Sequence, residues 1–147
     1  AERLAPGVDP NALVIEPYAN PFRTYPLSDD FNRFLELFTH RGINCYIFNT
    51  GHFGEKKVPK ELTLQILESI VENRAEFLPW EPFEELEIMF IEGFLPDLSD
   101  ESYKKLLRER LVDRYNFLRS REVERGGFDR LPQEAVESIS SLIKMVE

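Results

Sequence analysis

Five prolines in the first 27 residues constrain this chain more than any other feature of its sequence. Proline lacks a backbone N–H group and pushes the residue before it out of the helical region. We therefore predict an extended, Pro-rich segment over residues 1–27, with residues 12–15 as its only candidate strand. Helical patterning begins abruptly at Ser28, which predicts a single domain over residues 28–147. The prolines are Pro6, Pro10, Pro17, Pro21 and Pro26.

Apolar residues recur at helical spacing in four stretches after residue 27. The first stretch begins after Ser28, a favourable N-cap, and ends before Gly42, a favourable residue after a helix. The last follows Pro132, which suits a first helical turn, and its single apolar stripe predicts a helix packed in the core. We expect helices over residues 29–41, from 59 or 60 to 73–76, over 100–121 and over 132–146.

A β-branched and aromatic run between the first two helices predicts a buried strand over residues 43–48. Cys45 lies in this run, where we expect it to fill the core as a small apolar side chain. A second short strand is expected over residues 86–91. A helix, a buried strand, a turn and a helix indicate an α/β fold with a small sheet and about four helices, and an α+β fold is the alternative.

Charge and composition exclude several classes of function. The net charge of -9 and the pI near 4.8 disfavour binding to DNA or RNA, which needs clustered Lys and Arg. No stretch approaches the ~20 consecutive apolar residues of a membrane helix. One cysteine cannot form an internal disulfide, which fits a reducing compartment, and we expect a cytoplasmic protein. Because the chain begins without Met or the layout of a signal peptide, we expect a fragment of a larger protein.

The turn after the expected strand carries the residues best suited to bind a ligand. Open α/β sheets bind ligands where a buried strand ends, and Asn49, Thr50 and Gly51 supply small polar groups and a permissive backbone there. A local cluster of lysines follows, just before a helix N-terminus, and this combination favours phosphate. The alternative is an ordinary solvated loop. The lysines are Lys56, Lys57 and Lys60.

No catalytic or metal-binding motif occurs in the sequence. HExxH, CxxC, GxxxxGK[ST], GxGxxG and GxSxG are all absent, and His40 and His52 are the only histidines. The acidic residues show no spacing that singles out a pair for acid–base chemistry. Arginines and carboxylates alternate along residues 108–125, which indicates a salt-bridged helix face. We predict no catalytic residues and no metal ligands in the chain.

The segment Tyr46-Ile47-Phe48-Asn49-Thr50-Gly51 resembles a strand ending in Asn-Thr-Gly in the C-terminal lobe of ATP-dependent phosphoenolpyruvate carboxykinases. As in that family, Pro21-Phe22, Pro26, an amphipathic helix and Gly42 precede it. The family continues with Gly-Lys-Arg-Ile and a Thr that opens a helix. This chain continues with Glu55-Lys56-Lys57-Val58 and Thr63, and the resemblance covers about residues 20–121.

The resemblance implies that this stretch forms the adenine and ribose side of an ATP site. The family's Arg-Ile pair falls on Lys57 and Val58, and its helix Thr falls on Thr63, whereas Glu55 replaces a glycine and Lys57 lacks the planar guanidinium of Arg. The family's phosphate loop, metal ligands and oxaloacetate-binding arginines lie upstream. The implied nucleotide-binding residues are Asn49, Thr50, Gly51, Lys56, Lys57, Val58 and Thr63.

Two classes of function therefore remain. The first is the C-terminal domain of a carboxykinase-like nucleotide-binding protein, inactive alone, with ATP as its cofactor and the upstream portion of the same polypeptide as its partner. A divalent metal would join only with that upstream portion. The second is a protein-interaction or structural module that packs on a missing partner domain.

Overall fold

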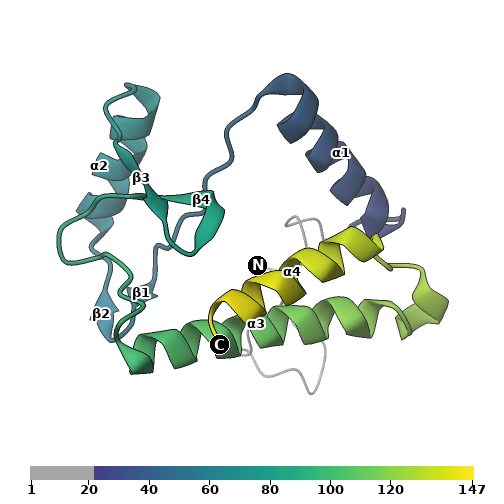
Figure 1. Ribbon diagram of the computed structural model, residues 1–147. Coiled ribbons are helices and arrows are strands. Elements are labelled where there is room, and N and C mark those ends of the chain that lie inside the picture. The colour runs from purple at the N-terminus through teal and green to yellow at the C-terminus, as the bar shows by residue number, and fades with distance from the viewer. Residues whose placement is uncertain (1–21) are drawn as a thin grey trace, which may run out of the picture.

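Four helices and two small antiparallel hairpins make up residues 22–147, the part of the chain that the computed structural model describes (Figure 1). The expected strand at residues 12–15 lies outside these residues. In chain order the elements are α1 (Leu27–Arg41), β1 (His52–Phe53), β2 (Lys56–Lys57), α2 (Lys60–Val71), β3 (Phe77–Trp80), β4 (Phe83–Met89), α3 (Glu101–Arg121), the 3-10 turn η2 (Glu124–Gly127) and α4 (Gln133–Met145).

The long helix α3 and the C-terminal helix α4 form an antiparallel pair (Figure 1). Asp100 caps α3, and its side chain accepts hydrogen bonds from the backbone N–H groups of Ser102 and Tyr103. The Ser102 hydroxyl also donates to this carboxylate at 2.6 Å, and this bond, followed by the two backbone hydrogen bonds, holds the pKa of Asp100 below its ordinary value. The chain reverses between the two helices through η2, where Gly127 has a left-handed φ of 78°.

One apolar cluster joins the helix pair to the β3–β4 hairpin. Its buried members are Phe83 of β4, Leu111 of α3 and Val146 just after α4. Trp80 of β3 packs edge-on against Phe83, with ring centroids 4.7 Å apart. Because an isolated hairpin is marginal in water, this cluster is what holds β3–β4 in place. Partly buried residues around it are Leu98, Leu107, Leu142 and Ile143.

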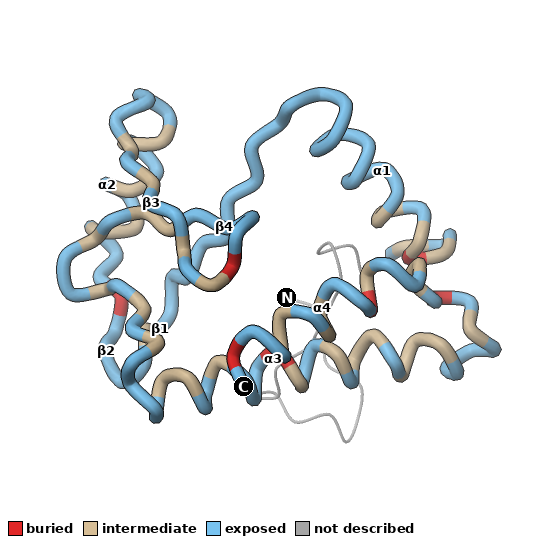
Figure 2. The backbone as a smooth tube through the Cα atoms, viewed as in Figure 1, coloured by how far each residue is buried: buried red, intermediate tan, exposed pale blue. Residues whose placement is uncertain are grey.

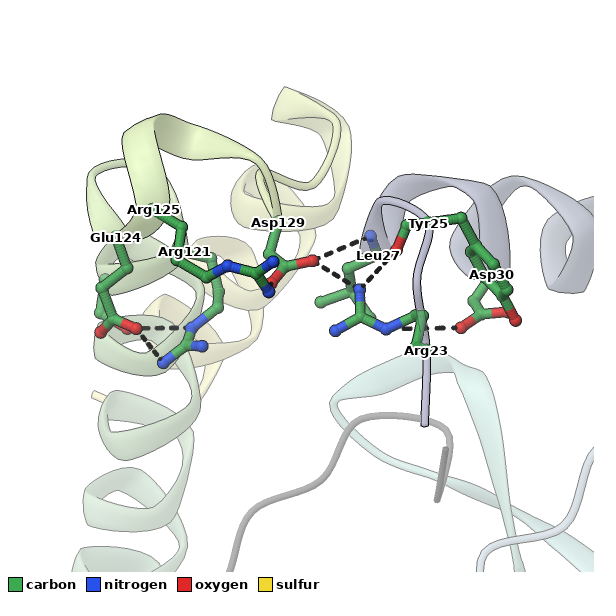
Figure 3. Close-up of polar contacts among 9 residues, drawn as sticks. Arg23, Tyr25, Leu27, Asp30, Arg121, Glu124, Arg125 and Asp129 are labelled. Atoms are coloured by element: carbon green, nitrogen blue, oxygen red, sulfur yellow. Dashed lines mark hydrogen bonds and ion pairs between the residues drawn. The ribbon is translucent and has the colours of Figure 1, made fainter. Parts of the chain in front are cut away.

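A buried ion pair fastens the start of α1 to the loop before α4 (Figure 3). The Arg23 guanidinium donates a hydrogen bond to Asp129, a residue 106 positions away in the chain. The Asp129 carboxylate also accepts from the Leu27 backbone N–H at 3.2 Å and faces Arg125 at 3.4 Å. The hydrogen bond from Arg23, with smaller effects from Leu27 and Arg125, lowers the pKa of Asp129 below its ordinary value.

The four predicted helices are confirmed, each within a few residues of its expected ends. α1 begins one residue before Ser28, and Pro26 takes the N-cap position instead. The second expected strand is also confirmed in part, because β4 covers residues 83–89. With helices and two separate two-stranded antiparallel sheets, the fold is a small mixed α+β arrangement. No helix within residues 22–147 has the length and hydrophobicity needed to cross a membrane.

The expected buried strand over residues 43–48 is wrong. These residues form neither helix nor strand, and every residue from 32 to 52 is exposed (Figure 2). Cys45 is exposed with them, so it does not fill the core. The run has the composition of a buried strand, but a strand forms only where another strand supplies its hydrogen bonds, and none lies beside it among residues 22–147.

Candidate functional site

The turn that follows residue 48 is closed by its own hydrogen bonds. The Asn49 carboxamide accepts a hydrogen bond from the Gly51 backbone N–H at 3.1 Å and donates one to the His52 carbonyl at 2.7 Å. The Val58 backbone N–H then donates to the Gly51 carbonyl at 2.9 Å. Asn49 and Gly51 therefore shape the turn, and the polar groups of the Asn49 side chain are used within it.

The hairpin β1–β2 extends from this turn and carries the first two lysines of the cluster. His52 pairs with Lys57 and Phe53 pairs with Lys56, so the members of each pair share one face of the hairpin. Gly54 occupies the first position of the two-residue loop with φ of 58°, where tight hairpins favour glycine. Consecutive strand residues point to opposite faces, so Lys56 and Lys57 are directed to different surroundings.

Lys56 is bound to a neighbouring loop. Its ammonium group donates to the Gly93 carbonyl at 3.2 Å and lies 4.3 Å above the Phe94 ring. Phe53, on the same face, packs against Phe94 and Tyr103 with centroid separations of 6.2 and 5.9 Å. Burial raises the pKa of the Tyr103 hydroxyl. The charge of Lys56 thus stabilises the packing of the hairpin on the loop before α3.

Lys57 lies on the other face and lines an open groove of about 580 Å³ at the start of α2. Val58, which is buried, forms part of its floor together with other apolar side chains. The groove is lined by Thr50, Lys57, Val58, Pro59, Lys60, Glu61, Thr63 and Leu64.

The N-terminus of α2 contributes backbone donors to this groove. Pro59 is the N-cap residue, and no side chain caps the helix. The backbone N–H groups of residues 60–62 have no acceptor within the helix, and the helix dipole makes this end positive. The Thr63 hydroxyl donates a long hydrogen bond of 3.5 Å to the Pro59 carbonyl. Lys60 adds an exposed cation in the first turn, and the adjacent Glu61 adds a negative charge.

The electrostatics of the groove favour anions only locally. Lys57 and Lys60 are exposed, and Glu61 lines the same groove. Charges in contact with water interact weakly and are screened within about 10 Å at 0.1 M salt. An anion in this groove would therefore be held mainly by the backbone N–H groups at the N-terminus of α2.

The structure places the seven residues implied by the resemblance in three different surroundings. Thr50, Lys57, Val58 and Thr63 come together in the groove. Asn49 and Gly51 form the turn beside it, and Lys56 is directed to the loop at Gly93. Sequence reasoning missed the apolar side of the groove, which Pro59 and Leu64 provide. Leu64 lies one helical turn after Lys60, so the spacing of α2 could have placed both on one face.

No group of three or more His, Cys, Asp or Glu side chains in residues 22–147 is arranged to hold a metal ion. The two histidines lie on different elements, His40 in α1 and His52 in β1. The His40 ring lies 2.8 Å from the Thr39 hydroxyl, and the His52 carbonyl accepts from Asn49.

Comparison with known proteins gives a distant and partial similarity. The phosphoenolpyruvate carboxykinase (ATP) of Aeropyrum pernix is 29% identical to this chain over 110 residues. The aligned part is 71% of this chain and 22% of that protein, so the chain spans less than a quarter of the relative that it matches. No protein-family model and no solved structure matches the chain. The resemblance noted in the sequence is confirmed at this level, as a divergent similarity to part of a carboxykinase.

Proposed function

We propose that this chain is a C-terminal portion of a carboxykinase-like protein and that the groove at the start of α2 forms one wall of its ATP site. One observation carries the proposal. Lys57, Val58 and Thr63, the three residues that the resemblance aligns with the nucleotide-binding motif, all line the same groove, at the junction of β2 and α2.

The groove offers each part of a nucleotide a suitable surface. Val58, Pro59 and Leu64 are apolar and can cover one face of a base. Lys57 can donate to ring nitrogens or to ribose hydroxyls, and Thr63 can donate or accept. The free N–H groups at the start of α2, with Lys60 beside them, suit the phosphates.

The proposed role of this chain is nucleotide binding, and the catalytic groups would come from other parts of such a protein. Residues 22–147 supply no cluster of metal ligands, and the sequence has no phosphate loop. ATP would bring a triphosphate that a divalent metal must neutralise, and the ligands for that metal would come from the remaining polypeptide. Binding to this chain alone should therefore be weak, in the millimolar range or near it.

The test is an NMR titration of the 147-residue chain with ATP, with adenosine and with tripolyphosphate. ATP should shift the backbone amide signals of Val58, Lys60 and Thr63 at low salt, and the shifts should shrink as salt rises. Lys57→Ala should weaken the response several-fold. Lys144→Ala removes an exposed lysine in α4 and should leave it unchanged.

Three results separate the components of the proposal. Shifts with adenosine and ATP but not tripolyphosphate would assign the groove to the base and ribose. Shifts with tripolyphosphate alone would reduce the groove to an anion site and contradict the nucleotide assignment. The absence of shifts around residues 57–63 at millimolar ATP, or shifts confined to other residues, would refute the site.

The second candidate function, a module that packs on a partner domain, is favoured by a separate observation. Large apolar side chains are exposed along α1 and the segment after it, including Leu35 at 38%, Phe38 at 51% and Ile47 at 97%. Soluble proteins rarely leave contiguous apolar surface of this kind uncovered. The two functions are compatible, because a nucleotide-binding wall can also be an interface between two parts of one protein.

A further inference from the structure

The β1–β2 hairpin is too short to hold its own position. Each of its strands has two residues, so the hairpin contains two residue pairs. An isolated two-stranded hairpin is marginally stable in water even when its strands are longer. One hydrogen bond closes its base, from the Val58 backbone N–H to the Gly51 carbonyl at 2.9 Å. The orientation of the hairpin therefore depends on contacts with other parts of the fold.

These contacts lie on one face of the hairpin. Phe53 and Lys56 form one residue pair and share that face. The Phe53 ring packs against Phe94 and Tyr103, with centroid separations of 6.2 and 5.9 Å. The Lys56 ammonium group donates to the Gly93 carbonyl at 3.2 Å and lies 4.3 Å from the centre of the Phe94 ring. This face is thus attached to the loop before α3, and Figure 1 shows the hairpin beside the start of that helix.

The opposite face of the hairpin belongs to the groove. Lys57 lies on that face and lines the groove, and the next residue, Val58, is buried at its floor. Consecutive side chains of a strand point to opposite faces, so the direction of the Lys57 side chain follows from that of Lys56. Fixing Lys56 against the loop therefore fixes where residues 57 and 58 lie relative to the N-terminus of α2.

We propose that Lys56 is a positioning residue of the nucleotide groove, which keeps Lys57 directed to the groove and does not itself contact the nucleotide. This inference rests on the proposal that the groove binds ATP. The resemblance to carboxykinases implies a nucleotide contact for Lys56, and the contacts of its ammonium group indicate a different role. To reach a ligand in the groove, this group would have to leave both the Gly93 carbonyl and the Phe94 ring.

Gly93 allows the same contact to be disturbed from its other end. A Cβ at this position would lie 2.8 Å from the Lys56 ammonium nitrogen. Because that nitrogen ends a flexible side chain, Gly93→Ala should displace the ammonium group and leave the residues of the groove unaltered. Gly93 has a φ of 75°, so alanine is also strained there. Gly42→Ala is the matched control, since Gly42 has a φ of 61° and a Cβ there would meet nothing within 4 Å.

The first measurement needs no nucleotide and follows hydrogen exchange of the Val58 amide in the 147-residue chain. Lys56→Met keeps the aliphatic stem and removes the charge, and it should speed this exchange about fivefold, because an exposed cation–π contact and a hydrogen bond are each modest. Lys56→Arg should keep the slow exchange, since a guanidinium can donate to the same carbonyl and lie over the same ring. Lys144→Met makes the same change at an exposed position in α4 and should have no effect.

The second measurement is the ATP titration of the same variants by NMR. Lys56→Met and Gly93→Ala should weaken the response of residues 57–63 several-fold, whereas Lys56→Arg and Gly42→Ala should keep it. The double variant with Lys56→Met and Lys57→Ala distinguishes positioning from direct contact. It should bind ATP no more weakly than Lys57→Ala alone, because a residue that acts only through Lys57 has nothing left to position.

Losses that multiply in the double variant would show that Lys56 contacts the nucleotide directly and would overturn the inference. An undiminished ATP response in Lys56→Met, or unchanged exchange of the Val58 amide, would overturn it as well. The proposed function fails in a different way. If the unmodified chain gives no ATP response, the nucleotide groove is refuted, and the exchange of Val58 in Lys56→Met and Lys56→Arg still decides whether Lys56 holds the hairpin in place.

Discussion

Replacing Asp129 by Asn should cost about 3 kcal/mol of unfolding free energy, although the substitution changes almost no volume. The Arg23 and Asp129 side chains are only 10% and 4% exposed. Removing one partner of a buried ion pair typically costs about 3–5 kcal/mol, because the remaining charge stays buried without its counter-charge. The lower end applies here, since an Asn oxygen can still accept from the Leu27 backbone N–H and the Arg23 guanidinium still faces the Asp30 carboxylate at 4.0 Å. Against a total stability of roughly 5–15 kcal/mol, this loss is large.

The assay is urea unfolding of both proteins at pH 7, followed by far-ultraviolet circular dichroism. With a slope of about 2 kcal/mol per molar urea, a loss of about 3 kcal/mol lowers the midpoint by about 1.5 M. The control is Asp113→Asn, which breaks an ion pair with Arg110 whose side chains are 65% and 64% exposed. Exposed pairs contribute little, so the control should lose less than about 1 kcal/mol. Equal losses in the two variants would refute the claim that the buried pair anchors α1.

The same pair predicts a pH dependence with a definite sign. The hydrogen bond from Arg23 and the nearby charges hold the pKa of Asp129 in the folded protein below its ordinary value of 3.8. A lowered folded pKa stabilises the folded state above the ordinary pKa, and this contribution is lost as pH falls through the lowered value. The stability gap between wild type and Asp129→Asn should therefore be constant from pH 7 to about 5 and should narrow below about pH 4. A gap that widens with acid would contradict the assignment.

Three further predictions address the packing and the activity of the chain. Gly127→Ala should cost at least about 1 kcal/mol more than Gly126→Ala, because both have positive φ but only the first places a Cβ 2.9 Å from the Glu122 carbonyl oxygen; equal urea midpoints would contradict this. Phe83→Ala should cost about 3–5 kcal/mol and change the fluorescence of Trp80, the only tryptophan, and a loss below about 1 kcal/mol would mean that Phe83 does not hold the hairpin to the helices. The 147-residue chain should not decarboxylate oxaloacetate with ATP and Mg²⁺, and turnover above a buffer blank would show catalytic groups that the sequence does not reveal.

The helices could be predicted because their signals are local. Apolar spacing, Gly42 after α1 and Pro132 before α4 set the type and ends of each helix within a few residues of chain. The N-cap of α1 lies two residues before the predicted Ser28, because the Leu27 backbone N–H is bound by Asp129, a residue 102 positions away that local sequence does not reveal.

The strands could not be predicted equally well, because pairing depends on distant residues. β3 contains Pro79, which marks a break in sequence but is tolerated beside a bulge in a two-stranded sheet. β1 and β2 are two residues each, too short for any periodic pattern. Residues 43–48 have the composition of a strand, but no strand within residues 22–147 pairs with them. Amino-acid composition indicates that a segment can form a strand, and the neighbouring parts of the fold determine whether it does.

The candidate site was predictable in part, for the same reason. The groove residues Lys57 and Thr63 follow from position relative to a helix N-terminus, which is a local property. The contacts of Lys56 with Gly93 and Phe94 could not be predicted, because they depend on a loop 37 residues away in the chain. The Arg23–Asp129 pair joins residues 106 apart, and neither has a sequence context that distinguishes it from the other charged residues of the chain.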